Sequence, residues 1–297
     1  MRRRYTIAWL ALAASAAPAS AADEPVLALE PTTDWVLDYA EERCSFYRAF
    51  GDGEDALTLR IDSFGPGADV RFLVIGPAIP EFGQPTDDLA YRLTPDEGER
   101  ETMGLNGKVE DLPAISFTAN FSPYVDPETY RRMRDDERRE LDRSPKMPAP
   151  EFEARVNSIE MKFRDGRRVR LALGRMARPL AALRQCVDNL QQSWGLDPAV
   201  QASLSRIAVP KPSTVRRVQR RYPQTMWLSG TNAFVPVRVM VSAEGRATAC
   251  VVQMPEIDQA FKDAVCEGLE SAYEPALDAE GRAVASVYRT SVFYLTG

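Results

Sequence analysis

The chain has 297 residues, about twice a common single-domain length, so its length predicts one large domain or two smaller ones. Hydrophobic residues make up 44% and charged residues 27%, a globular composition that excludes collagen-like, coiled-coil and disordered proteins. There is no histidine, which excludes Ser-His-Asp and Cys-His nucleophile chemistry and the common His-containing zinc sites. A net charge of −6 supplies no positive field, so we expect no nucleic-acid partner.

The first 21 residues have the pattern of a secretory signal peptide. Arg2-Arg3-Arg4 is a positive n-region, residues 7–17 form a short apolar stretch, and Ala19-Ser20-Ala21 is a small-residue cleavage site. We expect cleavage after Ala21 and export of the mature chain to the periplasm. An uncleaved anchor is the alternative, but the Ala-rich run is shorter than the ~20 residues that a membrane span needs.

The mature chain carries four cysteines, which permit three disulfide pairings: Cys44, Cys186, Cys250 and Cys266. An exported chain enters an oxidising space, and the spacings fit no metal-ligand motif such as Cys-x-x-Cys. We predict Cys44–Cys186 and Cys250–Cys266, because this pairing keeps each bridge inside one of the domains proposed below. We expect no metal site and no cofactor.

The chain composition changes after a predicted helix over residues 180–194, which Gly195 and Pro198 end. Residues 199–214 are predicted to be a partly helical linker with a proline-rich end. The predicted organisation is a signal peptide (1–21), an N-terminal domain (22–198), a linker (199–214) and a C-terminal domain (215–297).

The N-terminal domain is predicted to be mainly antiparallel β, as a sheet or small barrel, with a closing helix. Its strand-like segments are 35–39, 56–64, 70–75, 158–164 and 167–173. Asp165-Gly166 is a hairpin turn signal between the last two. Residues 128–146 mix arginines with acids at helical spacing, which predicts a solvated helix rather than a partner surface.

The C-terminal domain has a β-β-α-β pattern. Alternating valines from Val235 to Val241 predict one strand, and residues 247–253 predict a second. A helical apolar stripe runs from Ile257 to Ala272, and a long last strand covers residues 284–295. We therefore predict a three-stranded antiparallel sheet covered on one face by one helix, and an α+β fold class for the whole chain.

An ordered set of residues runs through this segment: Tyr222-Pro223, Gly230, Val237-x-Val239-x-Val241, Gly245, Cys250-Val251-Val252, Tyr273-Glu274-Pro275-Ala276, Gly281 and Val287 to Leu295. Over about a quarter of the chain, these features resemble the TonB C-terminal domain family. In that family the domain lies in the periplasm of Gram-negative bacteria. It binds the extended N-terminal peptide of outer-membrane TonB-dependent receptors by adding that peptide to its sheet.

The resemblance implies a periplasmic, non-enzymatic binding or adaptor protein that meets a membrane only through its partners in outer-membrane transport. A β-β-α-β sheet leaves one edge with unpaired N–H and C=O groups that a receptor peptide can complete. We expect Arg289 to supply an exposed contact. The expected partner-binding residues are Val287, Arg289, Ser291, Phe293 and Leu295.

Other functions stay open at this point. The last strand is alternatively a plain edge of a stable module or a homodimer contact. The chain is alternatively an exported enzyme or an envelope structural protein whose function lies in the N-terminal domain. The enzyme hypothesis depends on the carboxylate pairs Asp87-Asp88 and Asp135-Asp136, although adjacent acids of this kind are usually solvated.

Overall fold

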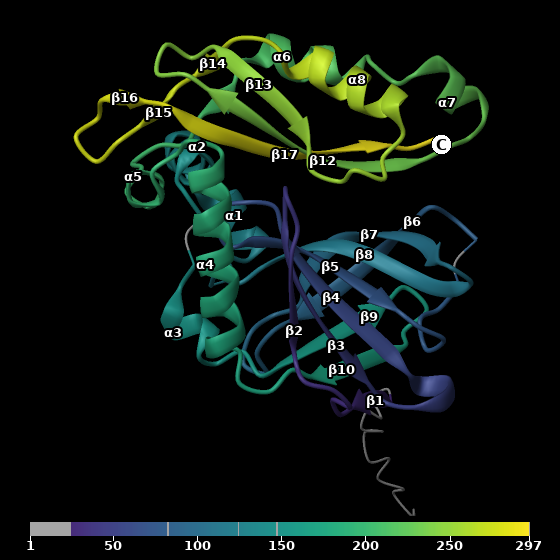
Figure 1. Cartoon of the computed structure of the whole chain (residues 1–297). Coiled ribbons are helices and arrows are strands. Elements are labelled where there is room, and N and C mark those ends of the chain that lie inside the picture. Colours follow the sequence, from purple (N-terminus) through teal and green to yellow (C-terminus); the bar gives the residue numbers. More distant parts are fainter. Residues whose placement is uncertain (1–24, 82, 124, 147, 297) are drawn as a thin grey trace, which may run out of the picture.

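The computed structural model describes residues 25–81, 83–123, 125–146 and 148–296. The chain has a mixed α+β fold in which strands predominate, as predicted, with a larger N-terminal part and a smaller C-terminal part lying against it (Figure 1). The predicted signal peptide lies outside the described residues. Among the residues described, none of the helices has the length and hydropathy that a bilayer span requires.

The N-terminal domain is built on one curled sheet of ten strands in the spatial order β1-β10-β9-β6-β7-β8-β5-β4-β3-β2. Its strands are β1 (Val26–Leu29), β2 (Val36–Tyr39), β3 (Cys44–Phe50), β4 (Leu57–Ser63), β5 (Asp69–Ile75), β6 (Thr86–Arg92), β7 (Arg100–Val109), β8 (Leu112–Asn120), β9 (Ser158–Phe163) and β10 (Arg168–Ala172). Neighbours are antiparallel, apart from the parallel pair β1–β10. Beyond β1, Pro31 pairs with Phe50 at the end of β3, so the N-terminal segment joins the two sides of the curled sheet.

Alternation along the strands decides which side chains enter the core of this sheet. On β4, Leu57, Leu59 and Ile61 are buried among the core aromatics, while Arg60 and Asp62 lie on the opposite face. Asp62 is nevertheless fully buried. The outer face of β4 is therefore covered at Asp62, while Thr58 and Arg60 on the same face stay partly exposed.

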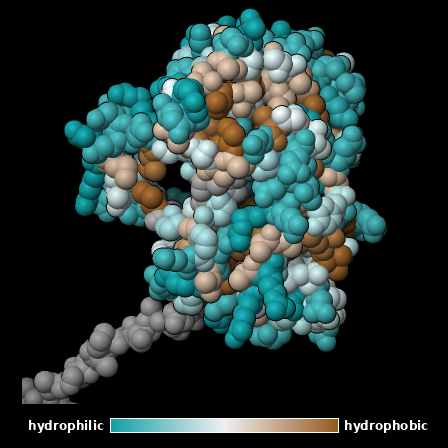
Figure 2. Space-filling model, turned by 60° about the vertical axis from the view of Figure 1, so that its left-hand side comes forward, coloured by the Kyte–Doolittle hydropathy of each residue, from teal (hydrophilic) through white to brown (hydrophobic). Residues whose placement is uncertain are grey.

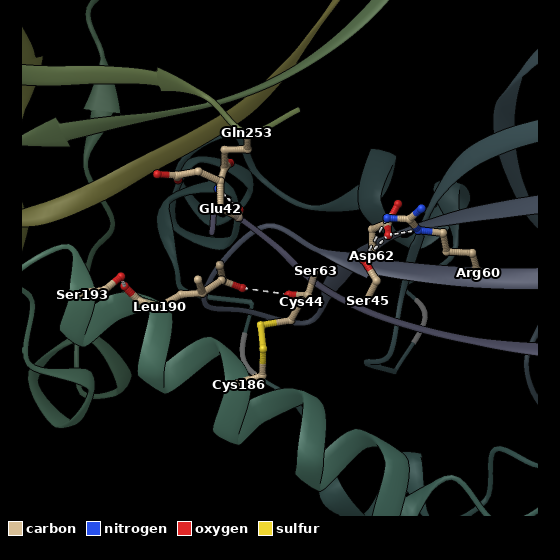
Figure 3. Close-up of a disulfide and its surroundings, with 11 residues drawn as sticks. Glu42, Cys44, Ser45, Arg60, Asp62, Ser63, Cys186, Leu190, Ser193 and Gln253 are labelled. Carbon is tan, nitrogen blue, oxygen red and sulfur yellow. Dashed lines mark hydrogen bonds and ion pairs between the residues drawn. A yellow bond between two sulfur atoms is a disulfide. The ribbon is translucent and has the colours of Figure 1, made fainter. Parts of the chain in front are cut away.

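Helix α4 (Ala177–Ser193) is the predicted closing helix and packs its apolar stripe onto the sheet. The Cys44–Cys186 disulfide ties it to β3, with 6.0 Å between the two Cα atoms, as predicted (Figure 3). The shorter helices α1 (Pro127–Arg132), α2 (Asp135–Arg143) and α3 (Pro150–Glu153) lie between β8 and β9. No residue of α1 or α2 is buried, which agrees with the predicted solvated segment. In the view of Figure 2 the surface is mainly hydrophilic, with apolar residues in separate patches.

The C-terminal domain contains a three-stranded antiparallel sheet in the order β13-β12-β17. Its strands are β12 (Ala233–Val241), β13 (Ala247–Val252) and β17 (Ser286–Tyr294). Helix α8 (Gln259–Leu269) covers one face, where the alternating valines of β12 are at most 1% exposed and pack with Phe261, Val265 and Leu269. The Cys250–Cys266 disulfide joins β13 to α8, as predicted, with 5.6 Å between the Cα atoms.

The segment predicted as a linker, 199–214, is instead folded onto the C-terminal domain. It carries α5 (Pro198–Ala202), β11 (Val209–Pro210) and the start of α6 (Pro212–Gln219), and Ala208 is buried in the C-terminal core. Both prolines of the proline-rich end have a local role, because Pro210 lies in β11 and Pro212 occupies the first turn of α6. The remaining elements are α7 (Gln224–Leu228), β14 (Tyr273–Glu274), which pairs with β11, and the hairpin of β15 (Ala276–Leu277) and β16 (Ala283–Val284).

The two domains meet across the face of the C-terminal sheet that is opposite α8, so the sheet lies between the helices and the N-terminal domain (Figure 1). Arg238 of β12 donates two hydrogen bonds to Glu42, at 2.6 and 2.7 Å, and its guanidinium lies 4.6 Å from the Trp194 ring centroid. The Gln253 amide donates to the carbonyls of Glu42 and Phe64, at 2.9 and 2.7 Å. Figure 3 shows Gln253 and Glu42 close to the Cys44–Cys186 bridge.

Candidate functional site

The outer edge of β17 is the candidate site. β17 pairs with β12 from Ser286 to Tyr294, and no other described strand pairs with it. A strand in this position presents backbone N–H and C=O groups that have no ladder partner. The expectation of an edge left open by the last strand therefore matches the pairing seen here.

Hydrogen bonds within the sheet identify which residues of β17 direct their backbone outward. Gln253 N–H donates to the Pro236 carbonyl at 2.9 Å, so the even-numbered residues of β12 bond toward β13 and the odd-numbered ones toward β17. Val237 lies opposite Thr290, so the even-numbered residues of β17 bond to β12. The outward-directed residues of β17 are Val287, Arg289, Ser291 and Phe293. Leu295, just past β17, continues this series. These are the five partner-binding residues expected from the sequence.

The end of β17 opens onto a groove of about 450 Å³ between this strand and α6. It is lined by Pro210, Val215, Val218, Tyr222, Leu269, Tyr288, Thr290, Ser291, Val292, Phe293, Tyr294 and Leu295. Most of these side chains are apolar or aromatic, so the groove suits apolar side chains next to an open backbone edge. The start of β17 is different, because Gln201 of α5 donates to the Ala285 carbonyl and Val287 lies beside the chain that leads to α6.

Tyr294 places a polar group at the buried end of this groove. Its side chain is 3% exposed, and its hydroxyl has no hydrogen-bond partner among the described residues. Burial raises the pKa of Tyr294 to about 12, although the positive charge of Arg221 opposes the shift. The hydroxyl therefore stays protonated near neutral pH.

Arg289 differs from the expected exposed contact. Its side chain points to the N-terminal domain, where Nη2 donates to the Pro66 carbonyl. The aliphatic part of the Arg289 side chain passes over the turn at Gly65, where an added Cβ would lie 2.7 Å from Arg289 Cδ. Burial lowers the pKa of Arg289, and the charge of Asp69 only partly opposes this. The sequence carries no local signal for a contact between residues 223 positions apart.

The face of β17 that looks toward the N-terminal domain borders a second cavity, the interdomain cleft, of about 280 Å³. It is lined by Phe64, Asp69, Val70, Arg71, Thr118, Phe234, Pro236, Gln253, Arg289, Thr290, Ser291 and Phe293. Thr290, Ser291 and Phe293 line both the cleft and the groove. The free end of β17 therefore runs between two cavities, one on each face of the sheet.

A buried ion-pair network lies beneath the cleft. Arg71 donates to Asp62 through Nε, at 3.0 Å, and through Nη2, while Arg60 donates to the same carboxylate at 2.7 Å. Ser45 Oγ donates to Asp62 at 2.6 Å (Figure 3). Burial alone would raise the pKa of Asp62, but the charges of Arg71 and Arg60 and these hydrogen bonds outweigh it and hold the pKa below its ordinary 3.8. Sequence reasoning gave no indication of this network.

The carboxylate pairs behind the enzyme hypothesis do not assemble into an acid–base site. Asp87 is buried on β6 and its neighbour Asp88 is exposed, because successive strand residues face opposite sides of the sheet. Asp135 and Asp136 are exposed on α2 and form ion pairs with Arg138 and Arg134. Neither pair brings two carboxylates together in a cavity.

No family model, no curated protein and no solved structure matches this chain. What the open edge of β17 can bind therefore follows from its backbone, the groove and the cleft.

Proposed function

We propose that this chain is an exported, non-enzymatic adaptor that binds an extended peptide of another protein by taking it up as a fourth strand beside β17. The observation that carries the proposal is the unpaired edge of β17 opening onto the groove next to α6. The two disulfides support an oxidising compartment such as the periplasm.

The free edge of β17 meets the physical requirements of strand addition. The outward N–H and C=O groups of Ser291 and Phe293 supply a ladder of hydrogen bonds, each contributing about 1 kcal/mol net. Alternate side chains of the added strand would point into the groove, where Val215 and Val218 of α6 offer apolar contact.

The order β12-β13-α8-β17 and the free last strand support a TonB-like domain. On that resemblance, the partner to test first is the N-terminal peptide of a TonB-dependent outer-membrane receptor. The N-terminal domain would hold the C-terminal sheet by the face opposite α8, because Arg238 and Gln253 bond to it there.

A proline at Ser291 tests backbone pairing directly. Ser291→Pro removes an N–H that points away from β12, so the sheet of the free protein keeps its own hydrogen bonds. Ser291→Ala is the matched control, since it removes the hydroxyl and keeps the N–H. We expect labelled receptor N-terminal peptides to bind the wild-type chain and the Ala variant alike in fluorescence anisotropy, and the Pro variant at least about tenfold more weakly.

Thermal unfolding of the three proteins checks that each is folded. Equal binding by the folded Pro variant would rule out pairing at this edge, and so would failure of every receptor peptide to bind the wild-type chain.

A further inference from the structure

We propose that the N-terminal domain forms one wall of the peptide site, and that the site selects an extended segment with an acidic residue between two apolar residues. The acidic side chain would enter the interdomain cleft, and its apolar neighbours would enter the groove beside α6. This inference rests on the proposed strand addition at β17. It adds the partner's side-chain pattern and assigns its recognition to Arg289 and Arg71.

The geometry of β17 separates the two kinds of side chain. Phe293 lies opposite Phe234, and their rings pack 5.3 Å apart on the face toward the N-terminal domain. Ser291 shares this face, whereas Thr290 and Val292 lie opposite the buried valines and face the α8 side. Because cross-strand neighbours share a face, a peptide residue beside Ser291 points into the cleft and the two residues next to it point into the groove.

The cleft offers hydrogen-bond donors that the protein itself leaves largely unused. The Arg289 guanidinium donates through Nη2 to Pro66, and the structure gives its Nε and Nη1 no hydrogen bond among the described residues. Among the described residues, the one hydrogen bond of Arg71 Nη1 goes to the Met254 sulfur, at 3.1 Å, while the other Arg71 nitrogens bind Asp62. Guanidinium donors of this kind are best satisfied by a carboxylate.

The surroundings of these donors favour a buried charged contact. Arg71 is 7% exposed, and its guanidinium lies between the rings of Phe64 and Phe234, at 5.5 and 5.3 Å from their centroids. Asp62 neutralises much of the Arg71 charge, and Asp69 lines the same cleft, where its charge acts on Arg289. The preference for an acid therefore depends on the Arg289 Nε and Nη1 donors, which have no hydrogen-bond partner among the described residues, rather than on the overall charge of −6.

The groove and the interdomain cleft also differ in polarity, as recognition of an acidic residue between two apolar residues requires. The groove is lined by Val218, Leu269, Val292 and several tyrosines, which suits Val, Ile or Leu side chains. The cleft, of about 280 Å³, combines the two arginines with the carboxylate of Asp69 and the hydroxyls of Thr118 and Ser291. A one-residue shift of the peptide would place its acid in the groove and its apolar side chains among the charges.

The test uses the full chain and short labelled peptides with Ser-Thr flanks around a variable core. Cores of Val-Glu-Val, Val-Gln-Val, Val-Lys-Val and the shifted Glu-Val-Glu are compared by fluorescence anisotropy. We expect Val-Glu-Val to bind about tenfold more tightly than Val-Gln-Val, a difference of about 1.4 kcal/mol, and the other two to bind more weakly still. The difference should shrink between about 50 mM and about 500 mM salt.

Two variants assign the preference to the cleft. Arg289→Gln should bring the Glu and Gln peptides to equal affinity, whereas Arg246→Gln, at a turn beside the opposite edge strand and 75% exposed, should leave the preference intact. Thr118→Glu, on the exposed face of β8, should reverse the preference in favour of the Lys peptide, with Thr118→Gln as its neutral control. The Thr118 pair keeps the test valid even if Arg289→Gln fails to fold.

The outcomes separate this inference from the proposed function. Binding that Ser291→Pro abolishes, with equal affinity for the Glu and Gln peptides, would overturn the acidic preference and leave strand addition standing. A Glu preference that neither Arg289→Gln nor Thr118→Glu alters would also overturn it. If the peptides do not bind, or bind the folded Pro variant equally well, strand addition itself fails.

Discussion

The two faces of the C-terminal sheet are held by different interactions. Toward α8, the alternating valines of β12 are at most 1% exposed and pack against Phe261 and Val265. Toward the N-terminal domain, Arg238, Gln253 and Arg289 make directed hydrogen bonds. The first face gives the domain its own core by apolar burial, and the second fixes its orientation through polar contacts that contribute geometry more than stability. The free edge of β17 lies where the two faces meet.

The largest effect is expected from a charge on the α8 face. Val237→Asp places a carboxylate at a fully buried position among apolar core residues, which costs at least several kcal/mol. We expect the C-terminal domain to unfold while the N-terminal domain keeps its own transition in calorimetry. Ser291→Asp, on the other face of the same sheet, is the control and should unfold close to wild type. A stable Val237→Asp protein would contradict the assignment of this face as the core.

Removing the disulfide on the α8 face comes next. Replacing Cys250 and Cys266 by Ser opens a bridge with a sequence separation of 16, which the chain-entropy model values at about 3 kcal/mol. Urea unfolding should show this loss in the transition of the C-terminal domain. An unchanged midpoint would mean that α8 is held to β13 by packing alone.

The polar face is expected to respond more weakly and in a different way. Glu42→Gln leaves the Arg238 guanidinium, 9% exposed, without its charged partner but with a hydrogen-bond acceptor, at a cost of about 2 kcal/mol. Both domains should stay folded while their contact loosens, which small-angle scattering would detect as an increase in the radius of gyration. The exposed neighbour variant Glu41→Gln is the control, and an equal response from both would show that the Glu42–Arg238 pair does not hold the interface.

The smallest effect concerns pH. Because the pKa of Asp62 is lowered in the folded protein, its contribution is fully present above the unfolded value of 3.8 and is lost as pH falls through the folded pKa, below 3.8. We expect this network to add no pH dependence to the melting temperature between about pH 5 and 7. In stronger acid, wild type should lose more stability than Asp62→Asn. Parallel melting curves for the two proteins down to the lowest pH would contradict this.

The sequence predicted those parts of the fold that depend on local periodicity. Alternation gave β4 and β12, helical periodicity gave α4 and α8, and domain-wise pairing gave both disulfides. Strand β7 was not predicted from the sequence, because only Arg100 and Gly104 of its ten residues are buried and it therefore has no apolar alternation. The segment 199–214 was predicted to be a partly helical linker, and it carries α5 and the start of α6; its packing against the C-terminal core was not predicted, because a first-turn proline such as Pro212 is also common in loops.

For the candidate site, the sequence predicted the backbone and missed the surroundings. Ser291 and Phe293, which the sequence predicted as partner-binding residues, direct their backbone away from β12. The cleft and the Arg289 contact depend on how two domains dock, and residues so far apart in the chain leave no joint pattern in a single sequence. The Asp62–Arg71 network was hidden for the same reason.

The close contact between Gly65 and the Arg289 side chain should couple the evolution of these two positions. Its φ of +143° is a conformation that other residues rarely adopt, and a Cβ there would displace the Arg289 stem, 2.7 Å away. Wherever related genes keep an arginine at the position of Arg289, they should keep glycine at the position of Gly65. Where a residue with a short side chain replaces the arginine, other residues that tolerate this backbone conformation should be able to replace the glycine. Paired substitution of the two positions across species would then be evidence for this contact.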